Sequence, residues 1–325
     1  MISTAFTRTF GVTAPVMQGG MQWIGKAELA AAVSNAGGLG CITALTHPTP
    51  ADLAIAIERC RDLTDRPFAV NITTLPSINP PPYDEYRRVI IDGGVRVVET
   101  SGSNPAEFMP IYRDAGIKVV HKVTSRRHAL KAREAGVDAV AVIGFEAAGH
   151  PGELDVPSLT LLPAIVRELD IPVLGAGGFA DGAGLVAALA LGADGILMAT
   201  RFMATRETPI HDRVKAALVA GDELGTALIF RQLDNTARVV RNGVAEEVVR
   251  RLNEGSDFAG VRELVAGARG RTVYETGDTE AGIWWAGISQ ALIEDVPSCE
   301  ELLNRIVGDA EELIGTGLPQ LVGRS

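Results

Sequence analysis

Short apolar runs rich in β-branched residues alternate with amphipathic stretches over the first 221 residues of the chain. The runs predict strands at residues 14–19, 38–43, 68–73, 95–101, 117–123, 139–144, 171–178 and 194–200. A stretch with helical spacing follows each run, at residues 26–37, 49–63, 82–94, 104–116, 125–136, 158–169, 181–192 and 209–221. Several runs are almost continuously apolar, which is typical of parallel strands covered on both faces.

This succession predicts an α/β fold of the (β/α)8 TIM-barrel type for residues 1–221. Many of the predicted helices begin after Thr, Ser, Asn or Asp and end at Gly, which is the chemistry of helix caps. The alternative is a doubly wound open sheet, but GxGxxG does not follow the first strand. In a barrel, the active site lies on the loops after the strands.

The pattern changes after residue 221. Residues 222–290 read as helices without intervening strands, and we interpret them as a helical subdomain that walls off a substrate cleft beside the barrel mouth. Residues 291–325 contain one more amphipathic stretch, which we expect to form a C-terminal helix that packs back on the barrel.

Composition narrows the function classes. A net charge of −10 without a basic stripe argues against nucleic acid as a partner. We find no apolar run long enough to span a membrane and no signal-peptide pattern. The cysteines, Cys41, Cys60 and Cys299, show no CxxC spacing, and His47, His121, His128 and His211 form no HxH or HExxH pattern. We therefore expect a cytoplasmic enzyme with reduced core cysteines and no metal site, while the oligomeric state stays open.

Glycine-rich segments follow the first, sixth, seventh and eighth predicted strands, so all of them are expected at one mouth of the barrel. The seventh and eighth loops of such barrels often bind phosphate through backbone N–H groups. Gly177 and Gly178 would allow close backbone approach, and Ala199, Thr200 and Arg201 would offer amides and a charge. The alternative is that the two glycines only form a tight turn.

Polar residues also end two otherwise apolar strands, with Asn71 and Thr73 on the third and Lys122 on the fifth. Such groups face the mouth more often than the packed interior. Lys122 could lie over an electron-rich ring or an anionic oxygen, and the alternative is a lysine whose ammonium reaches solvent.

His150 lies in the segment GFEAAGHPGE, residues 144–153, which contains almost no other chemistry. A lone histidine is usually structural, but this one follows the sixth strand and faces the predicted mouth. With no carboxylate at triad spacing, we expect a lone base or hydrogen-bond donor.

Two further segments have both a functional and a structural interpretation. The proline-rich residues 75–86 form a stiff stretch that could gate the mouth or serve only as a connector. Trp284 and Trp285 could form an aromatic wall for a flat ligand or pack in the core.

The segments PVMQGGMQW (15–23), AAAVSNAGGLG (30–40), GFEAAGHPGE (144–153) and GAGGFADGAGLVAALALGADGILMATRF (175–202) resemble the nitronate monooxygenase family, formerly called 2-nitropropane dioxygenases. The resemblance covers nearly the whole chain. The family is similar to bacterial FMN-dependent enoyl-acyl-carrier-protein reductases. QGGMQW and the proline-rich segment look most like a bacterial branch of NADH:quinone reductases.

This resemblance implies a noncovalent FMN across the barrel mouth. It places Gly20, Met21 and Gln22 along the flavin, Thr73 and Lys122 near its ring, Ala148 and Ala176 in its site, and Gly177, Gly178, Ala199 and Thr200 at its phosphate. His150 matches the family's active-site histidine. Some relatives have an acidic residue in place of Ile143 and a serine in place of Ala176, which weakens the transfer of flavin contacts to these two positions.

The activity implied first is an NAD(P)H:quinone reductase, in which NAD(P)H binds transiently because no Rossmann fingerprint is present. The alternative is a nitronate monooxygenase that oxidises alkyl nitronates with O2. From the residues alone, a barrel that binds a phosphorylated ligand without redox chemistry is a third hypothesis.

Overall fold

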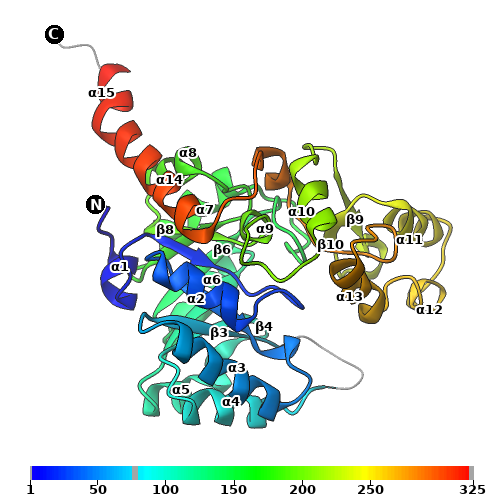
Figure 1. Ribbon diagram of the computed structural model, residues 1–325, viewed down its shortest axis with the longest axis horizontal. Coiled ribbons are helices and arrows are strands. Elements are labelled where there is room, and N and C mark those ends of the chain that lie inside the picture. The colour runs from blue at the N-terminus through cyan, green and yellow to red at the C-terminus, as the bar shows by residue number, and fades with distance from the viewer. Residues whose placement is uncertain (1, 75–79, 322–325) are drawn as a thin grey trace.

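The computed structural model describes residues 2–74 and 80–321, and eight parallel strands form its centre (Figure 1). They are β1 (Val16–Gln18), β2 (Gly40–Thr43), β3 (Phe68–Thr74), β4 (Val97–Gly102), β5 (Lys118–Val123), β6 (Ala139–Ile143), β7 (Val173–Ala176) and β8 (Gly195–Met198). From β2 to β8 each strand pairs with its neighbour in the chain, and β1 pairs with β8. A bridge between Met17 and Leu39 joins β1 to β2, so the sheet closes into the predicted barrel.

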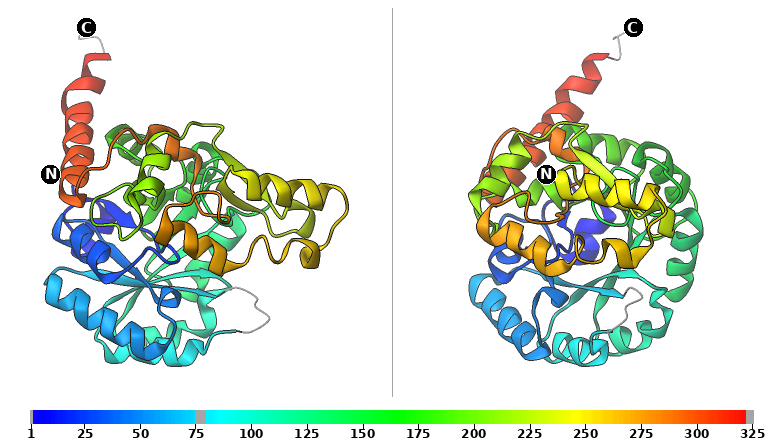
Figure 2. Two further views of the ribbon diagram at one scale, coloured as in Figure 1. Left: turned by 45° about the vertical axis from the view of Figure 1, so that its right-hand side comes forward. Right: turned by 90° about the vertical axis from the view of Figure 1, so that its right-hand side faces the viewer.

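Helices surround this barrel, as the caps and periodicity predict (Figure 2). They are α2 (Ala27–Asn35), α3 (Pro50–Leu63), α4 (Tyr83–Asp92), α5 (Met109–Asp114), α6 (Arg126–Ala135), α7 (Ser158–Val166), α8 (Gly182–Ala190) and α10 (Asp212–Val219), with the short α9 (Thr200–Met203) directly after β8. Thr49 begins α3 with a capping box, and the Asp181 carboxylate accepts from Gly184 N at the start of α8. Local side-chain chemistry therefore fixes where α3 and α8 begin.

A short helix that the sequence pattern did not predict, α1 (Ala5–Phe10), closes the N-terminal end of the barrel. Its Phe6 and Phe10 side chains are buried against apolar side chains from the barrel interior. That cluster includes Met17, Leu39, Cys41, Ala69, Val97, Val120, Ala141, Leu174 and Leu197. Because apolar side chains fill this interior, a ligand has to bind at the opposite, C-terminal end of the strands.

Residues 222–290 differ from the prediction. They contain an antiparallel hairpin of β9 (Thr226–Ile229) and β10 (Ala237–Val240), followed by α11 (Gly243–Asn253), α12 (Phe258–Val261) and α13 (Gly267–Thr276). The expectation of helices without strands is wrong for the hairpin, because β10 contains Arg238 and the hairpin lacks the long apolar runs by which the barrel strands are recognised. The segment buries a core of its own that includes Ile229, Val239, Val248, Leu252 and Val261. Figure 2 shows these helices in front of the barrel ring.

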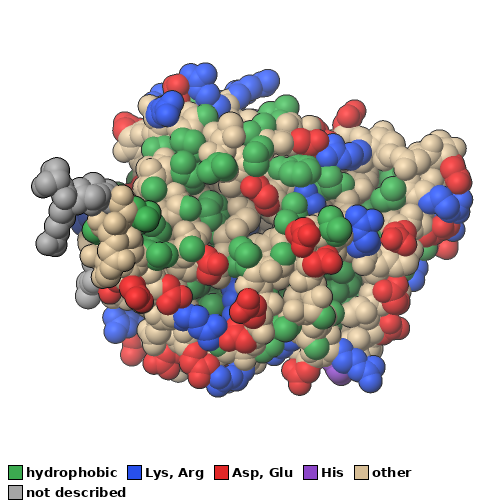
Figure 3. Space-filling model, turned by 90° about the horizontal axis from the view of Figure 1, so that it is seen from above, with side chains coloured by type: hydrophobic (Ala, Val, Ile, Leu, Met, Phe, Trp, Pro, Cys, Tyr) green, Lys and Arg blue, Asp and Glu red, His purple; other side chains and the backbone are tan. Residues whose placement is uncertain are grey.

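The chain returns to the barrel through α14 (Cys299–Glu312), which packs against α8 and α2. Gly182 makes close contact possible, since a Cβ there would lie 2.6 Å from the Cβ of Asp309. A π-helical turn (Leu313–Gly317) and α15 (Leu318–Leu321) continue away from the body (Figure 1). No helix in the described part of the chain is long and apolar enough to cross a membrane. Acidic and basic side chains are interspersed over the face shown in Figure 3.

Candidate active site

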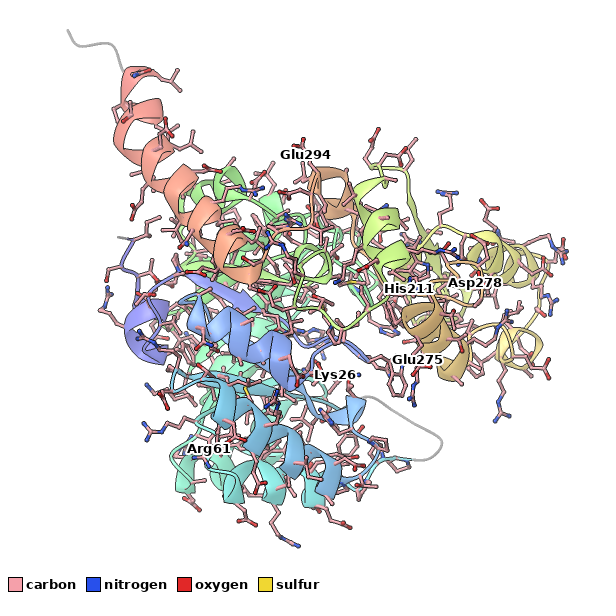
Figure 4. The ribbon with its side chains drawn as sticks, viewed as in Figure 1. Lys26, Arg61, His211, Glu275, Asp278 and Glu294 are labelled. Atoms are coloured by element: carbon pink, nitrogen blue, oxygen red, sulfur yellow. The ribbon has the colours of Figure 1, made fainter. Side chains whose placement is uncertain are left out.

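A cavity of about 630 Å³ lies at the C-terminal ends of the barrel strands, with part of its wall supplied by residues beyond 222. The site residues implied by the family resemblance all line it: Gly20, Met21, Gln22, Thr73, Lys122, Ala148, His150, Ala176, Gly177, Gly178, Ala199 and Thr200. His211, in contrast, lies where α10 meets α13 (Figure 4), and its backbone N–H donates to Tyr274 O. The fold thus gathers residues from six of the strand ends around one space.

The loops after β7 and β8 present main-chain donors. Gly177 and Gly178 have φ angles of 88° and 85°, which L side chains rarely adopt. A Cβ on Gly177 would also lie 3.0 Å from Gly144 O. Within the described residues, the N–H groups of Gly177, Gly178, Ala199 and Thr200 donate to no acceptor. Four such donors beside one cavity are suited to bind an anion.

Ser158 and Glu146 fix the direction of two of these N–H groups, and sequence reasoning missed both residues. The Ser158 hydroxyl lies 2.7 Å from Gly177 O and 3.0 Å from Ala176 O, while the Glu146 carboxylate accepts from Ser158 N at 3.0 Å. In a trans peptide the C=O and N–H groups point in opposite directions. Holding the two carbonyls therefore turns the N–H groups of Gly177 and Gly178 away from Ser158.

The eighth loop differs from the prediction in its side chains. The Thr200 hydroxyl accepts a hydrogen bond from Gly287 N at 3.0 Å, so it joins the loop to the late segment of the chain. Arg201 is buried, and its guanidinium lies 2.6 Å from an Asp295 carboxylate oxygen and 3.1 Å from Asp295 O. The expectation that Arg201 offers its charge to a phosphate is wrong, because Asp295 already pairs with it.

A charged cluster lies at the inner side of the cavity wall. Glu99 is fully buried, and its Oε2 accepts from Asn71 Nδ2 at 2.6 Å and from Gly20 N at 3.0 Å. The Lys122 ammonium lies 3.0 Å from Glu99 Oε1, outside the geometry of a hydrogen bond, so this contact is ionic. The Thr73 and Ser101 hydroxyls lie 2.8 Å apart nearby. Glu99 was missed, and a single carboxylate in the apolar run VRVVETS is the signal that could have revealed it.

His150 lies in the loop after β6 and also lines the cavity. Its ring is exposed to the cavity and lies 6.1 Å from the Trp285 ring, centroid to centroid, at a tilt of 41°. Protein atoms around the ring lower the pKa of His150, and the negative charge of Glu153 opposes this shift. Of the tryptophan pair, Trp285 lines the cavity, whereas Trp284 is buried in the core.

The loop that carries His150 is bound to the hairpin. Gly149 and Arg238 exchange two backbone hydrogen bonds, of 3.0 and 2.7 Å. The Glu153 carboxylate accepts from Thr236 N at 2.7 Å and also contacts the Thr236 hydroxyl. The hairpin thus holds His150 in place as well as covering part of the cavity.

The remaining part of the wall includes Ile143 and Ala176, the two positions expected to differ from some relatives, and residues of the proline-rich segment. Ile143 and Ala176 are both buried at the ends of β6 and β7 and line the cavity with apolar atoms. Residues 75–79, which belong to the proposed gate, lie outside the described residues. From the rest of that segment, Pro81 and Tyr83 line the cavity.

Comparison with known proteins gives a consistent result. A model of the nitronate monooxygenase family matches residues 3–92 and 80–309. The chain is 33% identical to a (3aS,4S,5R,7aS)-5-hydroxy-7a-methyl-1-oxo-octahydro-1H-indene-4-carboxyl-CoA dehydrogenase of Rhodococcus jostii RHA1, over 95% of this chain and 96% of the relative. It is 28% identical to a probable nitronate monooxygenase of Staphylococcus saprophyticus, over 96% and 99%.

Comparison with solved structures points to the same group of proteins. FabK from Thermotoga maritima superposes with a TM-score of 0.91 at 33% identity, over 99% of this chain and 100% of that one. A nitroalkane oxidase from Streptomyces ansochromogenes superposes with a TM-score of 0.81 at 28% identity, over 96% and 99%. The fold, including the segment after residue 222, is thus similar to that of these proteins over nearly their whole length.

Proposed function

Since this chain belongs to the nitronate monooxygenase family and is an oxidoreductase, we propose that it binds FMN noncovalently and transfers electrons from NAD(P)H to a quinone. FMN supplies the redox chemistry, because its ring accepts a hydride and passes on two electrons. The protein's part is to bind and orient the reacting molecules and to control their protons.

The donor set at the seventh and eighth loops supports FMN. The N–H groups of Gly177, Gly178, Ala199 and Thr200, which are unpaired among residues 2–74 and 80–321, suit a phosphate, which needs several donors and close backbone approach. Gly20 leaves room beside Asn71, since a Cβ there would lie 2.3 Å from Asn71 Cγ. In this proposal Gly20, Met21, Gln22, Ala148 and Ala176 flank the ring, and Thr73 and Lys122 lie near its polar edge.

The single observation that favours a quinone is the charge of the cavity wall. Among the described lining residues, one lysine (Lys122) and one glutamate (Glu153) carry charged side chains, and no arginine or aspartate lines the cavity. Lys122 is already paired with Glu99. The lowered pKa of His150 keeps its imidazole neutral at neutral pH. A wall without an unbalanced cation suits a neutral, flat acceptor better than an anionic nitronate.

His150 and Trp285 suit such an acceptor. The Trp285 ring offers an apolar face, and the neighbouring His150 ring offers a nitrogen-bound proton to a quinone oxygen. The attachment of the His150 loop to the hairpin keeps that donor in a fixed position. We further propose that residues 222–290 act as the unit that closes the substrate cleft.

A second candidate is oxidation of alkyl nitronates with O2. It is favoured by the names of relatives that are similar over nearly the whole chain, a probable nitronate monooxygenase and a nitroalkane oxidase. In that reaction a neutral His150 would act as a base toward a nitroalkane. The cavity charge argues for the quinone as the better substrate.

Anaerobic mixing of the yellow protein with NADH or NADPH, followed at the flavin absorbance, tests the proposal. We expect rapid bleaching that an added quinone reverses. Absence of bleaching, together with oxygen uptake on addition of a nitronate, would replace the reductase by the monooxygenase. A colourless protein that takes up no FMN would contradict both and favour a non-redox phosphate-binding barrel.

A further inference from the structure

The Glu99–Lys122 pair is the one charged contact described within the barrel wall beneath the cavity. Glu99 is 0% exposed, and the side chain of Lys122 retains 19% exposure on the cavity side. Deeper in the barrel, Val97 and Val120 occupy the same strands with apolar side chains. A buried ion pair is rarely more stabilising than an apolar pair of similar size, because both charges lose their hydration. The pair therefore calls for an explanation other than stability.

The surroundings of Glu99 hold its carboxylate in one place. Register pairs Asn71 on β3 with Glu99 on β4, which places the Asn71 amide against Oε2. Gly20 N donates to the same oxygen, so Glu99 also fixes the start of the glycine segment that lines the cavity. Oε1 has no hydrogen-bond donor among the described residues and faces the Lys122 ammonium alone.

The field of this carboxylate extends beyond its contacts. Burial raises the pKa of Cys41 well above its ordinary value, the charge of Glu99 raises it further, and Lys122 lowers it. The two charges thus act in opposite directions on a group they do not touch. They must act in the same opposed way on a ligand whose own charge changes beside Lys122.

We propose that Glu99 is a positioning residue that sets the electron affinity of the bound flavin, by holding Lys122 at the ring and balancing its charge. The proposal rests on the FMN site proposed above. Reduction adds negative charge to the ring, so an unbalanced Lys122 favours the reduced form and an unbalanced Glu99 opposes it. With both present, the protein keeps the flavin able to return its electrons to an acceptor.

The test is the midpoint potential of the bound flavin, measured by equilibration with redox dyes in the reconstituted holoprotein. In Glu99→Gln we expect the equilibrium constant for reduction to rise at least tenfold, which is about 30 mV upward for a two-electron couple. In Lys122→Met we expect a shift of opposite sign. The double variant should lie within about threefold of the wild type, because it removes both charges.

Two further variants separate charge from packing. Glu99→Asp keeps the charge and should shift the potential less than Glu99→Gln. Glu207→Gln is the matched control, because that carboxylate accepts from Cys299 N and does not line the cavity. If Glu99→Gln does not fold, the proposal is tested by the potential shift in Lys122→Met and by the reversal of that shift in the double variant.

The outcomes distinguish this inference from the proposed function. Opposite shifts that cancel in the double variant support it. Unchanged potentials, or shifts of the same sign in both single variants, overturn it while leaving the FMN site intact. A wild-type protein that binds no FMN overturns the proposed function and this inference with it.

Discussion

Two sides of the cavity offer different groups to a bound ligand. The side formed by the loops after β7 and β8 presents main-chain N–H groups, with two left-handed glycines and carbonyls held by Ser158. The side formed by β3 to β6 presents side chains, with Lys122 balanced by Glu99 and His150 next to Trp285. Substitutions on the main-chain side should therefore change whether the cofactor binds. Substitutions on the side-chain side should change what the bound cofactor does.

The largest effect is expected on the side-chain side. His150→Ala should retain FMN, but its turnover number should be about 10²- to 10⁴-fold lower, which is the usual contribution of a positioned proton donor or base. Steady-state rates at equal flavin content measure this. Wild-type turnover in the variant would mean that His150 has no part in the reaction, and loss of FMN would remove the distinction between the two sides.

On the main-chain side, Gly177→Ala should weaken FMN binding by about 100-fold, because the left-handed backbone and the contact with Gly144 O together cost a few kcal/mol. Titration of the apoprotein with FMN, followed by fluorescence, gives the dissociation constant. Gly116→Ala is the control, because Gly116 has a φ of 68° and precedes β5 at the other end of the barrel. Apart from its two chain neighbours, no described residue has a heavy atom within 4 Å of the added Cβ. Equal weakening in both variants would indicate general destabilisation and contradict the assignment.

A smaller effect is expected for Ser158→Ala. Loss of the hydroxyl frees the Gly177 carbonyl, while Ala176 O still accepts from Gly144 N, and we expect FMN binding to weaken about fivefold, as for one lost hydrogen bond of about 1 kcal/mol. Turnover of the FMN-saturated enzyme should not change. Ser298→Ala, which removes the cap of α14, should lower the free energy of unfolding without affecting FMN affinity. A loss of turnover at saturating FMN in Ser158→Ala would contradict a purely orienting role.

The smallest effect concerns pH. Because the pKa of His150 is lowered, its imidazole stays neutral to below the ordinary histidine pKa of about 6.5. Turnover with a quinone should be flat above this pH and rise only at lower pH, because the protonated ring is the stronger hydrogen-bond donor to the quinone oxygen. Since Glu153 raises that pKa, Glu153→Gln should move the acid limb to still lower pH. A limb that begins above pH 6.5, or that moves upward in Glu153→Gln, would contradict this role for His150.

The barrel could be predicted from the sequence because its strands are buried on both faces. The run at 139–144 corresponds to β6 (Ala139–Ile143), and α3 begins after Thr49 as its cap chemistry predicts. The cavity residues could also be predicted, because glycine segments and His150 follow strands whose ends must meet at one mouth. Residue type and chain position together suffice for features of this kind.

What could not be predicted depends on contacts between distant segments. Glu99 faces Asn71 and Lys122 only through the register of β3, β4 and β5. Ser158 looked like the start of a helix, and its bond to Gly177 O depends on how α7 meets β7. Arg201 looked available for a phosphate until its pairing with Asp295, far along the chain, was known. The hairpin was missed because its strands pair only with each other and β10 contains Arg238, so the hairpin lacks the buried apolar runs of the barrel strands.

The most direct test of the account compares FMN with riboflavin, which lacks the phosphate, in binding to the wild-type apoprotein. Four N–H groups at the loops after β7 and β8, which have no acceptor in the described part of the chain, predict a preference for FMN of at least about 100-fold, as expected for several charge-assisted hydrogen bonds. That preference should shrink in Gly177→Ala. Equal affinity for the two flavins would contradict the claim that the main-chain side of the cavity binds the phosphate.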